Sequence, residues 1–295
     1  MIKRIIDISE QAYLHVLNRQ LCVDKAGETV AKIAFDDLGI LILQHPAIVV
    51  TQTVVTQCQE HNVALLFCDD RHLPVSIILP LVTGHSLHTK VLREQIASKK
   101  SHQKRLWQSV VKAKICEQAI TLTKAGQQSN KLLRLSEKVR SGDPDNIEAQ
   151  AAREYWKILM GASFRRDTNA DGVNSILNYG YSIMRAMVAR SLVGTGLHPA
   201  IGMHHKNQYN GLCLADDVME PLRPWVDEVV HSAFVLDKKI KVTKVTKQLL
   251  LGLLSQQVLY DGKKMPLMVS VHYLAAQLKY AMTDKDVSLK FPSRL

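Results

Sequence analysis

The hydrophobic pattern of this 295-residue chain changes its period near residue 90, and that change limits the fold more than any other feature. Before it, short runs rich in β-branched residues alternate apolar with polar side chains, as half-buried strands do. After it, long segments carry apolar residues at helical spacing. We therefore expect an α+β protein in which a β-sandwich-like domain precedes a larger all-α domain.

Short runs separated by turn signals define the β part. Eight of them are predicted strands: RIIDI, YLHVL, QLCVD, TVAKIAF, GILIL, AIVVTQT, VALLFCD and VSIIL. Thr51 to His61 is a predicted short helix. The change of period predicts an N-terminal domain over residues 1–85 and a C-terminal domain over 86–295, and later breaks such as Tyr260-Asp-Gly262 separate helices.

Positive charge is concentrated in one part of the chain. The formal net charge is +11, and 13 Lys or Arg against three Glu lie between Lys90 and Arg140. A second stretch, from Lys238 to Lys247, has five Lys. Lysine and arginine that neutralise phosphates release condensed counterions, so this distribution favours a nucleic-acid partner. The alternative is that both stretches are solvated helix faces.

Several classes of protein find no support in the sequence. The five cysteines form no CxxC pair, so no zinc site or disulfide framework is predicted, and a reducing cytoplasm is expected. The N-terminal residues MIKRIIDIS turn polar too soon to predict a signal peptide, and no apolar run approaches the length expected of a membrane helix. No P-loop or GxGxxG motif indicates nucleotide hydrolysis or dinucleotide binding.

Glu148 is the first candidate for chemistry. A helix is expected to start near Asp143, which can cap it, with Pro144 in the first turn. Helical spacing places Glu148 on the same face as Ala152 and Tyr155, among apolar residues. An ionised carboxylate there is costly unless it is paired or bound to a metal. Alternatively, it is a first-turn glutamate favoured by the helix dipole.

Two pairs of adjacent residues supply further candidates, His204-His205 and Asp216-Asp217. Neutral imidazole is a common metal ligand, and two neighbouring histidines point in different directions, so at most one is expected to bind the same ion. The aspartates also suit a helix N-terminus. A site made from a Glu, a His and an Asp suits Mg²⁺, which prefers oxygen, or Mn²⁺, which also tolerates imidazole.

A polar stripe lies on the helix predicted from Asn174 to Val193. Asn174, Asn178, Tyr181 and Arg185 share one face. Amide, phenol and guanidinium groups suit contacts with phosphate and sugar. An ordinary solvent-exposed face is the alternative.

Four ordered strings carry a resemblance to a known family. They are Glu148-x-x-Ala-Ala-Arg-x-Tyr-Trp156, Asn174-x-x-Leu-Asn-Tyr-Gly-Tyr181, Gly196-Leu-His-Pro-Ala-Ile-Gly-x-x-His205 and Leu214-Ala-Asp-Asp-x-Met-Glu-Pro-x-Arg-Pro224. With them the chain resembles the CRISPR-associated spacer-acquisition integrases, the Cas-one family, and members from type II systems above all. Leu222 departs from the aromatic residue often found in Pro-Phe-Arg-Pro, which we expect to affect packing rather than chemistry.

The resemblance implies a catalytic and metal-binding set of Glu148, His205 and Asp217. The Gly-x-x-His string selects His205 over His204, and the position before Val-Met-Glu selects Asp217 over Asp216. Tyr179 becomes a candidate for guiding a DNA end, with a core position as the alternative. The implied reaction inserts short foreign DNA into a CRISPR array by 3′-hydroxyl attack on a phosphodiester at the repeat boundary, with Mg²⁺ or Mn²⁺.

The resemblance also implies partners. The N-terminal domain would mediate dimerisation and partner contacts, and the C-terminal domain would bind metal and DNA. Expected partners are double-stranded DNA (the captured fragment and the repeat), a second copy of the chain, a small Cas-two subunit in a heterohexamer, and the type II effector nuclease. The rival functions are a metal-dependent structure-selective nuclease and a non-enzymatic DNA-binding scaffold. An RNA-binding module is less well supported, because aromatic residues make up only 5% of the chain.

Overall fold

The computed structural model describes residues 3–70, 72–80, 85–238, 240–284 and 286–295. Residues 81–84, just before the predicted domain boundary, and Lys239 in the second lysine stretch lie outside the described residues.

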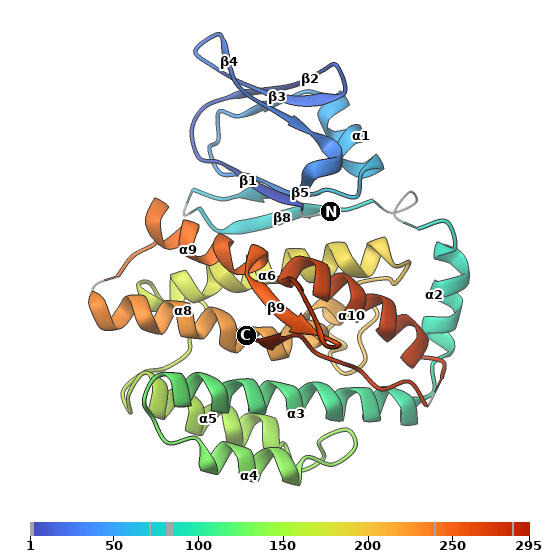
Figure 1. Ribbon diagram of the computed structural model, residues 1–295, viewed down its shortest axis with the longest axis vertical. Helices are drawn as coiled ribbons and strands as arrows, with labels where there is room; N and C mark the ends of the chain where they lie inside the picture. Colours follow the sequence, from blue (N-terminus) through green and yellow to red (C-terminus); the bar gives the residue numbers. More distant parts are fainter. Residues whose placement is uncertain (1–2, 71, 81–84, 239, 285) are drawn as a thin grey trace.

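The predicted strands form two four-stranded sheets in the N-terminal part (Figure 1). One sheet has the order β1-β5-β7-β8 and the other β4-β3-β2-β6. The elements are β1 (Arg4–Ile8), β2 (Tyr13–Leu17), β3 (Gln20–Lys25), β4 (Glu28–Ala34), β5 (Leu38–Leu43), β6 (Val49–Val50), α1 (Gln52–Glu60), β7 (Ala64–Cys68) and β8 (Pro74–Ile78). All eight predicted strands and the predicted short helix are confirmed.

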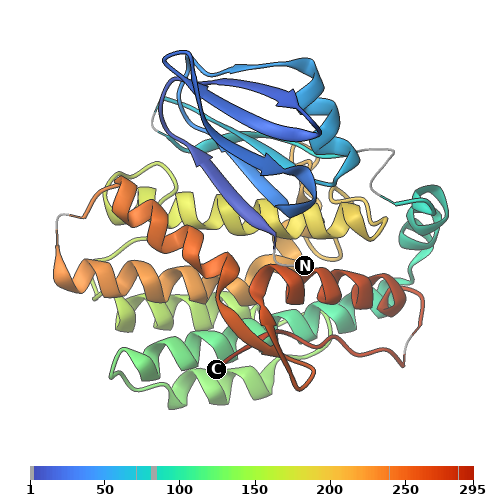
Figure 2. The ribbon, with the colours of Figure 1, turned by 45° about the horizontal axis from the view of Figure 1, so that its top comes forward.

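The first sheet is covered on both faces. Alternation along β5 sends Leu41 and Leu43 into the core between the two sheets, and Ile40 and Ile42 into the core of the helical part. Strands β1, β5 and β7 run parallel, as expected for strands without a solvated face. The helix α6 (Val173–Gly194) lies beneath this sheet (Figure 2). The sheet therefore joins the β part to the helical part through a shared core.

Helices make up most of the remaining chain, as predicted. They are α2 (His88–Ala97), α3 (Lys100–Lys124), α4 (Asn130–Lys138), α5 (Ile147–Leu159), α6, α7 (Cys213–Met219), the 3-10 helix η2 (Glu220–Leu222), α8 (Arg223–Leu236), α9 (Lys244–Ser255) and α10 (Leu267–Ala281). Within the described ranges, no helix has both the length and the apolar character needed to cross a membrane.

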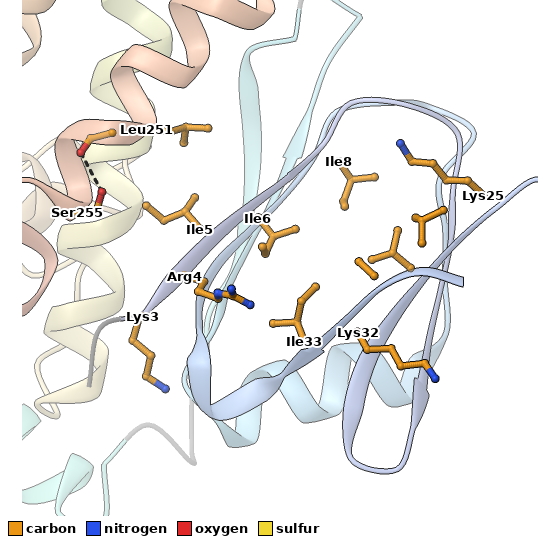
Figure 3. A pocket seen from close by; sticks show the side chains of 14 residues that line it. Lys3, Arg4, Ile5, Ile6, Ile8, Lys25, Lys32, Ile33, Leu251 and Ser255 are labelled. Atoms are coloured by element: carbon orange, nitrogen blue, oxygen red, sulfur yellow. Dashed lines mark hydrogen bonds between the residues drawn. The ribbon is translucent and has the colours of Figure 1, made fainter. Parts of the chain in front are cut away.

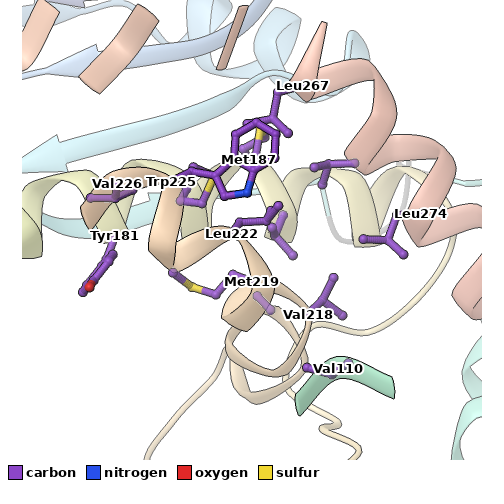
Figure 4. Packing of buried hydrophobic residues seen from close by; sticks show 14 of the residues in the cluster. Val110, Tyr181, Met187, Val218, Met219, Leu222, Trp225, Val226, Leu267 and Leu274 are labelled. Carbon is purple, nitrogen blue, oxygen red and sulfur yellow. The ribbon is translucent and has the colours of Figure 1, made fainter. Parts of the chain in front are cut away.

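Helix α6 is the central element of the helical part. A Cβ atom at Gly180 would lie 2.4 Å from Cγ1 of Val226, so glycine allows α6 and α8 to approach closely. Around this contact, buried side chains from α3, α6, α7, α8 and α10 interlock (Figure 4). Leu222 is 1% exposed within this core, which agrees with its expected role in packing.

A small antiparallel sheet interrupts the helices near the C-terminus, so the expectation of an all-α second domain was wrong in this detail. It has the order β10-β9-β11 and consists of β9 (Gln257–Tyr260), β10 (Lys263–Pro266) and β11 (Ser293–Arg294). Asp261 and Gly262 have φ values of 49° and 76°. Two successive left-handed residues match the turn of a tight hairpin, whereas the sequence analysis took this turn for a break between helices.

An open groove runs beside β1 and β4, one edge strand from each of the two large sheets, and α9 borders it (Figure 3). Ile6, Ile8 and Ile33 line the groove together with Lys25 and Lys32. None of its lining residues belongs to the candidate site described below.

Candidate functional site

Glu148 lies in the first turn of α5. The Asp143 carboxylate accepts hydrogen bonds from the backbone N–H of Ile147 at 2.9 Å and of Glu148 at 3.0 Å, so it caps the helix as predicted. The helix begins only at Ile147, because Asp143 and Asn146 take left-handed conformations in the turn before it. The prediction that Pro144 occupies the first turn was therefore wrong.

Lys114 of α3 links Glu148 to a second carboxylate. Its Nζ lies 2.6 Å from Oε1 of Glu148 and 2.5 Å from Oε2 of Glu220. Glu220 also accepts a hydrogen bond from Nε of Arg223 at 2.7 Å. The result is a largely buried chain of alternating charges, Glu148–Lys114–Glu220–Arg223.

Burial and charge act in opposite directions on this network. Burial would raise the pKa of Glu220, but Arg223 and Lys114 lower it to about 2. Burial would likewise lower the pKa of Lys114, and the two glutamates outweigh it, so that its pKa lies above the ordinary value. Both partners of the Lys114–Glu220 pair therefore stay charged at neutral pH.

Asp217 is fully buried and holds the loop that carries the histidines. Its Oδ2 accepts hydrogen bonds from the backbone N–H of Met203 at 2.6 Å and of His204 at 3.0 Å. Its Oδ1 accepts one from the backbone N–H of His205 and lies 2.6 Å from Nδ1 of the same residue. That contact raises the pKa of His205. A carboxylate hydrogen-bonded to one ring nitrogen fixes the orientation of the imidazole.

The two adjacent histidines have different surroundings, as predicted. The ring of His204 stacks on Trp107, with 4.1 Å between centroids and 3° between planes. The ring of His205 faces Asp217. Gly202 makes this turn possible, because a Cβ atom there would lie 2.3 Å from the carbonyl oxygen of His205.

The two adjacent aspartates also differ. Asp216 accepts hydrogen bonds from Nε and Nη2 of Arg185 at 2.7 and 2.8 Å, and from Asn210. Asp217 instead contacts the histidine loop. The structure thus associates Asp217 with His205 and Asp216 with Arg185, and the choice of Asp217 as metal ligand stays a prediction.

Electrostatics connect Glu148 with the histidine. The charges of Glu220 and Glu148 both contribute to raising the pKa of His205. Asp217 and Glu220 are three residues apart at the junction of α7 and η2, and Lys114 joins Glu220 to Glu148. The charges of candidates from distant parts of the sequence therefore influence one another, and their joint role in one metal site stays a prediction.

The candidate ligands have donor atoms that suit a metal ion, but their side chains are not arranged around one. Among the residues that the structure describes, no three His, Cys, Asp or Glu side chains are already arranged to hold one. The donor types nevertheless fit Mg²⁺ or Mn²⁺, since carboxylates and one imidazole are present. The Lys114 ammonium lies between Glu148 and Glu220, so a positive charge is already held among these carboxylates.

A cleft of about 470 Å³ opens beside His205 and contains part of the predicted polar stripe. Asn178, Tyr181 and Arg185 line it, as do Asp216 and two arginines that the sequence analysis did not single out, Arg166 and Arg223. The structure therefore brings three of the residues predicted to contact DNA next to a predicted metal ligand.

Two tyrosines of α6 are turned inward. The Tyr181 hydroxyl donates a hydrogen bond to the carboxylate of Asp227 on α8. Tyr155 of α5 donates a second hydrogen bond to the same carboxylate, at 2.9 Å. Burial raises the pKa of Asp227 to about 6, although these hydrogen bonds lower it.

Tyr179 is fully buried and its hydroxyl has no hydrogen-bond partner within the described ranges. It takes the core position that was its alternative, and a role in guiding DNA stays a prediction.

Lys114 could have been recognised from helical spacing. Every other Lys and Arg between positions 90 and 140 is exposed. Lys114 lies four residues after Val110 and four before Gln118, both buried on α3. A lysine in the buried stripe of a helix is a signal for a paired or functional charge, but it was counted only as part of the basic segment.

Comparisons with known proteins identify the family of the chain. The profile of the family described as "CRISPR associated protein Cas1" matches residues 6–259. The CRISPR-associated endonuclease Cas1 of Neisseria meningitidis is 33% identical over 296 residues, covering 99% of this chain and 96% of its own length.

Solved structures show the same fold. A casposase bound to an integration product has a TM-score of 0.79 at 19% identity, covering 98% of this chain and 92% of its own. A chain of a Cas6-RT-Cas1–Cas2 complex has a TM-score of 0.76 at 19% identity, covering 97% of this chain and 35% of its own. The family resemblance found in the sequence is confirmed: the chain belongs to the Cas1 family, the CRISPR-associated endonucleases and integrases of spacer acquisition.

Proposed function

We propose that this protein joins the 3′-hydroxyl of a captured DNA fragment to a phosphodiester at the boundary of a CRISPR repeat, with Mg²⁺ or Mn²⁺ held by Glu148, His205 and Asp217. The observation that carries the proposal is the cleft beside His205, which is lined by three arginines together with this one predicted metal ligand. Guanidinium groups recognise phosphate, so DNA and the ion would meet there.

The chain's own residues prepare this site. When bound, the ion would lower the pKa of the attacking hydroxyl and polarise the scissile phosphate. Asp217 orients the His205 imidazole, and Lys114 holds the Glu148 carboxylate. In the reaction the 3′-hydroxyl gives up its proton as its oxygen forms a bond to phosphorus, the original P–O bond of the repeat breaks, and the leaving oxygen takes up a proton. Positioning and fixed charges would supply most of the catalysis.

We also propose that the active form is an assembly. The expected components are a dimer of this chain, the small Cas2 subunit in a heterohexamer, and the type II effector nuclease as a further partner. Support comes from the Cas6-RT-Cas1–Cas2 complex, one chain of which contains this fold.

The direct test is an incubation of the purified protein, with its small partner subunit, on a supercoiled plasmid that carries a repeat array. With a labelled DNA fragment and Mn²⁺ or Mg²⁺, we expect branched products in which the label is joined to the plasmid. Addition of EDTA should abolish joining. Cut ends without joined label would favour the nuclease, and salt-sensitive binding without any turnover would favour the scaffold.

A further inference from the structure

Three guanidinium groups line the cleft beside His205, and two of them are neutralised by carboxylates. Arg185 forms a two-point contact with Asp216 at 2.7 and 2.8 Å. Arg223 donates to Glu220 at 2.7 Å. Because each of these charges is already paired, neither offers a full positive charge to an incoming anion.

Arg166 differs from both, because uncharged groups hold it. Its Nη1 donates to Oδ1 of Asn174 at 2.9 Å and to the carbonyl oxygen of Asp167 at 3.1 Å. Its Nη2 donates to Oδ1 of Asn178 at 2.5 Å. In the described part of the chain, no carboxylate lies within ion-pair distance of Arg166. Its charge is therefore fixed in place by neutral groups and forms no direct ion pair with a described carboxylate, although the buried Asp227 lies near enough to interact with it electrostatically.

The two amides are themselves held in this orientation. Nδ2 of Asn178 donates to the carbonyl oxygen of Thr168 at 2.7 Å, and Nδ2 of Asn174 donates to that of Arg165 at 3.2 Å. Since each amide nitrogen is engaged by a carbonyl, each amide oxygen must face the guanidinium. These contacts tie the loop before α6 to the helix itself, so the fold sets the position of Arg166.

The remaining donors of Arg166 suit a phosphate. A guanidinium has five N–H groups, and the contacts above use both hydrogens of Nη1 and one of Nη2. The Nε hydrogen and one Nη2 hydrogen remain, and a guanidinium can give two parallel hydrogen bonds to a phosphate. The Tyr181 ring, whose centroid lies 5.2 Å from Cζ of Arg166, further restricts the side chain.

We propose that Arg166 binds an anionic oxygen of the DNA phosphodiester that enters the cleft beside His205, with Asn174 and Asn178 as its positioning residues. This inference rests on the proposed function and names the group that receives the strand. It also changes the expected role of the two asparagines, which orient the arginine rather than contact DNA themselves.

Equilibrium binding tests the proposal without depending on catalysis. Binding of a fluorescein-labelled DNA duplex would be measured by anisotropy in EDTA over a series of salt concentrations. For Arg166→Gln we expect weaker binding and a salt-dependence slope smaller in magnitude by about 0.9, the value for one lost phosphate contact. Arg166→Lys keeps the charge and should keep the slope, but it should join DNA more slowly because it loses the planar fork.

Arg165→Gln is the matched control, because Arg165 is the preceding residue in the same loop but does not line the cleft. Its slope should stay at the wild-type value. If Arg166→Gln and Arg165→Gln show the same slope as the wild type, the assignment of Arg166 is wrong even though the wild type joins DNA. If the wild type does not join DNA in Mn²⁺ or Mg²⁺, the proposed function itself fails.

Discussion

Replacing Glu148 with glutamine is expected to reduce metal-dependent strand transfer by at least about 100-fold while the protein stays folded. Glutamine keeps the size of the side chain and can still accept a hydrogen bond from Lys114. It removes the negative charge that a hard divalent cation requires of its ligand. The change would be measured as the initial rate of joining at saturating DNA in Mn²⁺, with circular dichroism to confirm the fold.

Glu154→Gln is the matched control for this result. Glu154 lies on the same helix, α5, and pairs with the exposed Lys131 at 2.8 Å. Surface ion pairs contribute at most about 1 kcal/mol, so this variant should join DNA at the wild-type rate. A Glu148→Gln protein that joins as fast as Glu154→Gln would remove Glu148 from the site.

Replacing Lys114 with methionine is expected to destabilise the metal-free protein by about 3–5 kcal/mol, the usual cost of leaving a buried charge without its partner. Lys114 lies within 2.6 Å of two carboxylates and its side chain is 12% exposed. Arg223 would still neutralise Glu220, whereas Glu148 would lose its cation. Denaturation by urea in EDTA would measure the loss as a shift of the midpoint.

Lys112→Met provides the comparison, because Lys112 is exposed on the same helix two residues earlier. Its effect should stay within about 0.5 kcal/mol. Mn²⁺ should restore more stability to Lys114→Met than to the wild type, since the ion would return positive charge to Glu148. Equal midpoints for the two lysine variants would show that the buried network contributes little to stability.

The strands could be predicted because their signal is local. An alternation such as that of β5, with Ile40 and Ile42 on one face and Leu41 and Leu43 on the other, records burial directly in the sequence. The parallel order of the sheet and the hairpin at Asp261-Gly262 were not predicted. Strand order depends on contacts between distant segments, and the hairpin turn resembled an ordinary break between helices.

The candidate site residues were chosen from local signals too. Short motifs predicted Glu148, His205 and Asp217 as site residues, which stays a prediction, and helical spacing predicted the polar stripe of α6, part of which lines the cleft beside His205. The partners of these residues could not be foreseen from the motifs, because they come from other elements. Lys114 reaches Glu148 from 34 positions earlier, and Tyr181 donates to Asp227 from 46 positions earlier. Arg166 lies in a loop without a periodic pattern.

The most direct test of the central claim is a crystal structure of the protein grown with Mn²⁺, with the ion located by anomalous scattering. We expect one ion bound by the Glu148 carboxylate, the His205 imidazole and the Asp217 carboxylate, and Lys114 displaced from Glu148. An ion held elsewhere, or a Glu148–Lys114 contact unchanged at saturating Mn²⁺, would contradict the proposed metal site.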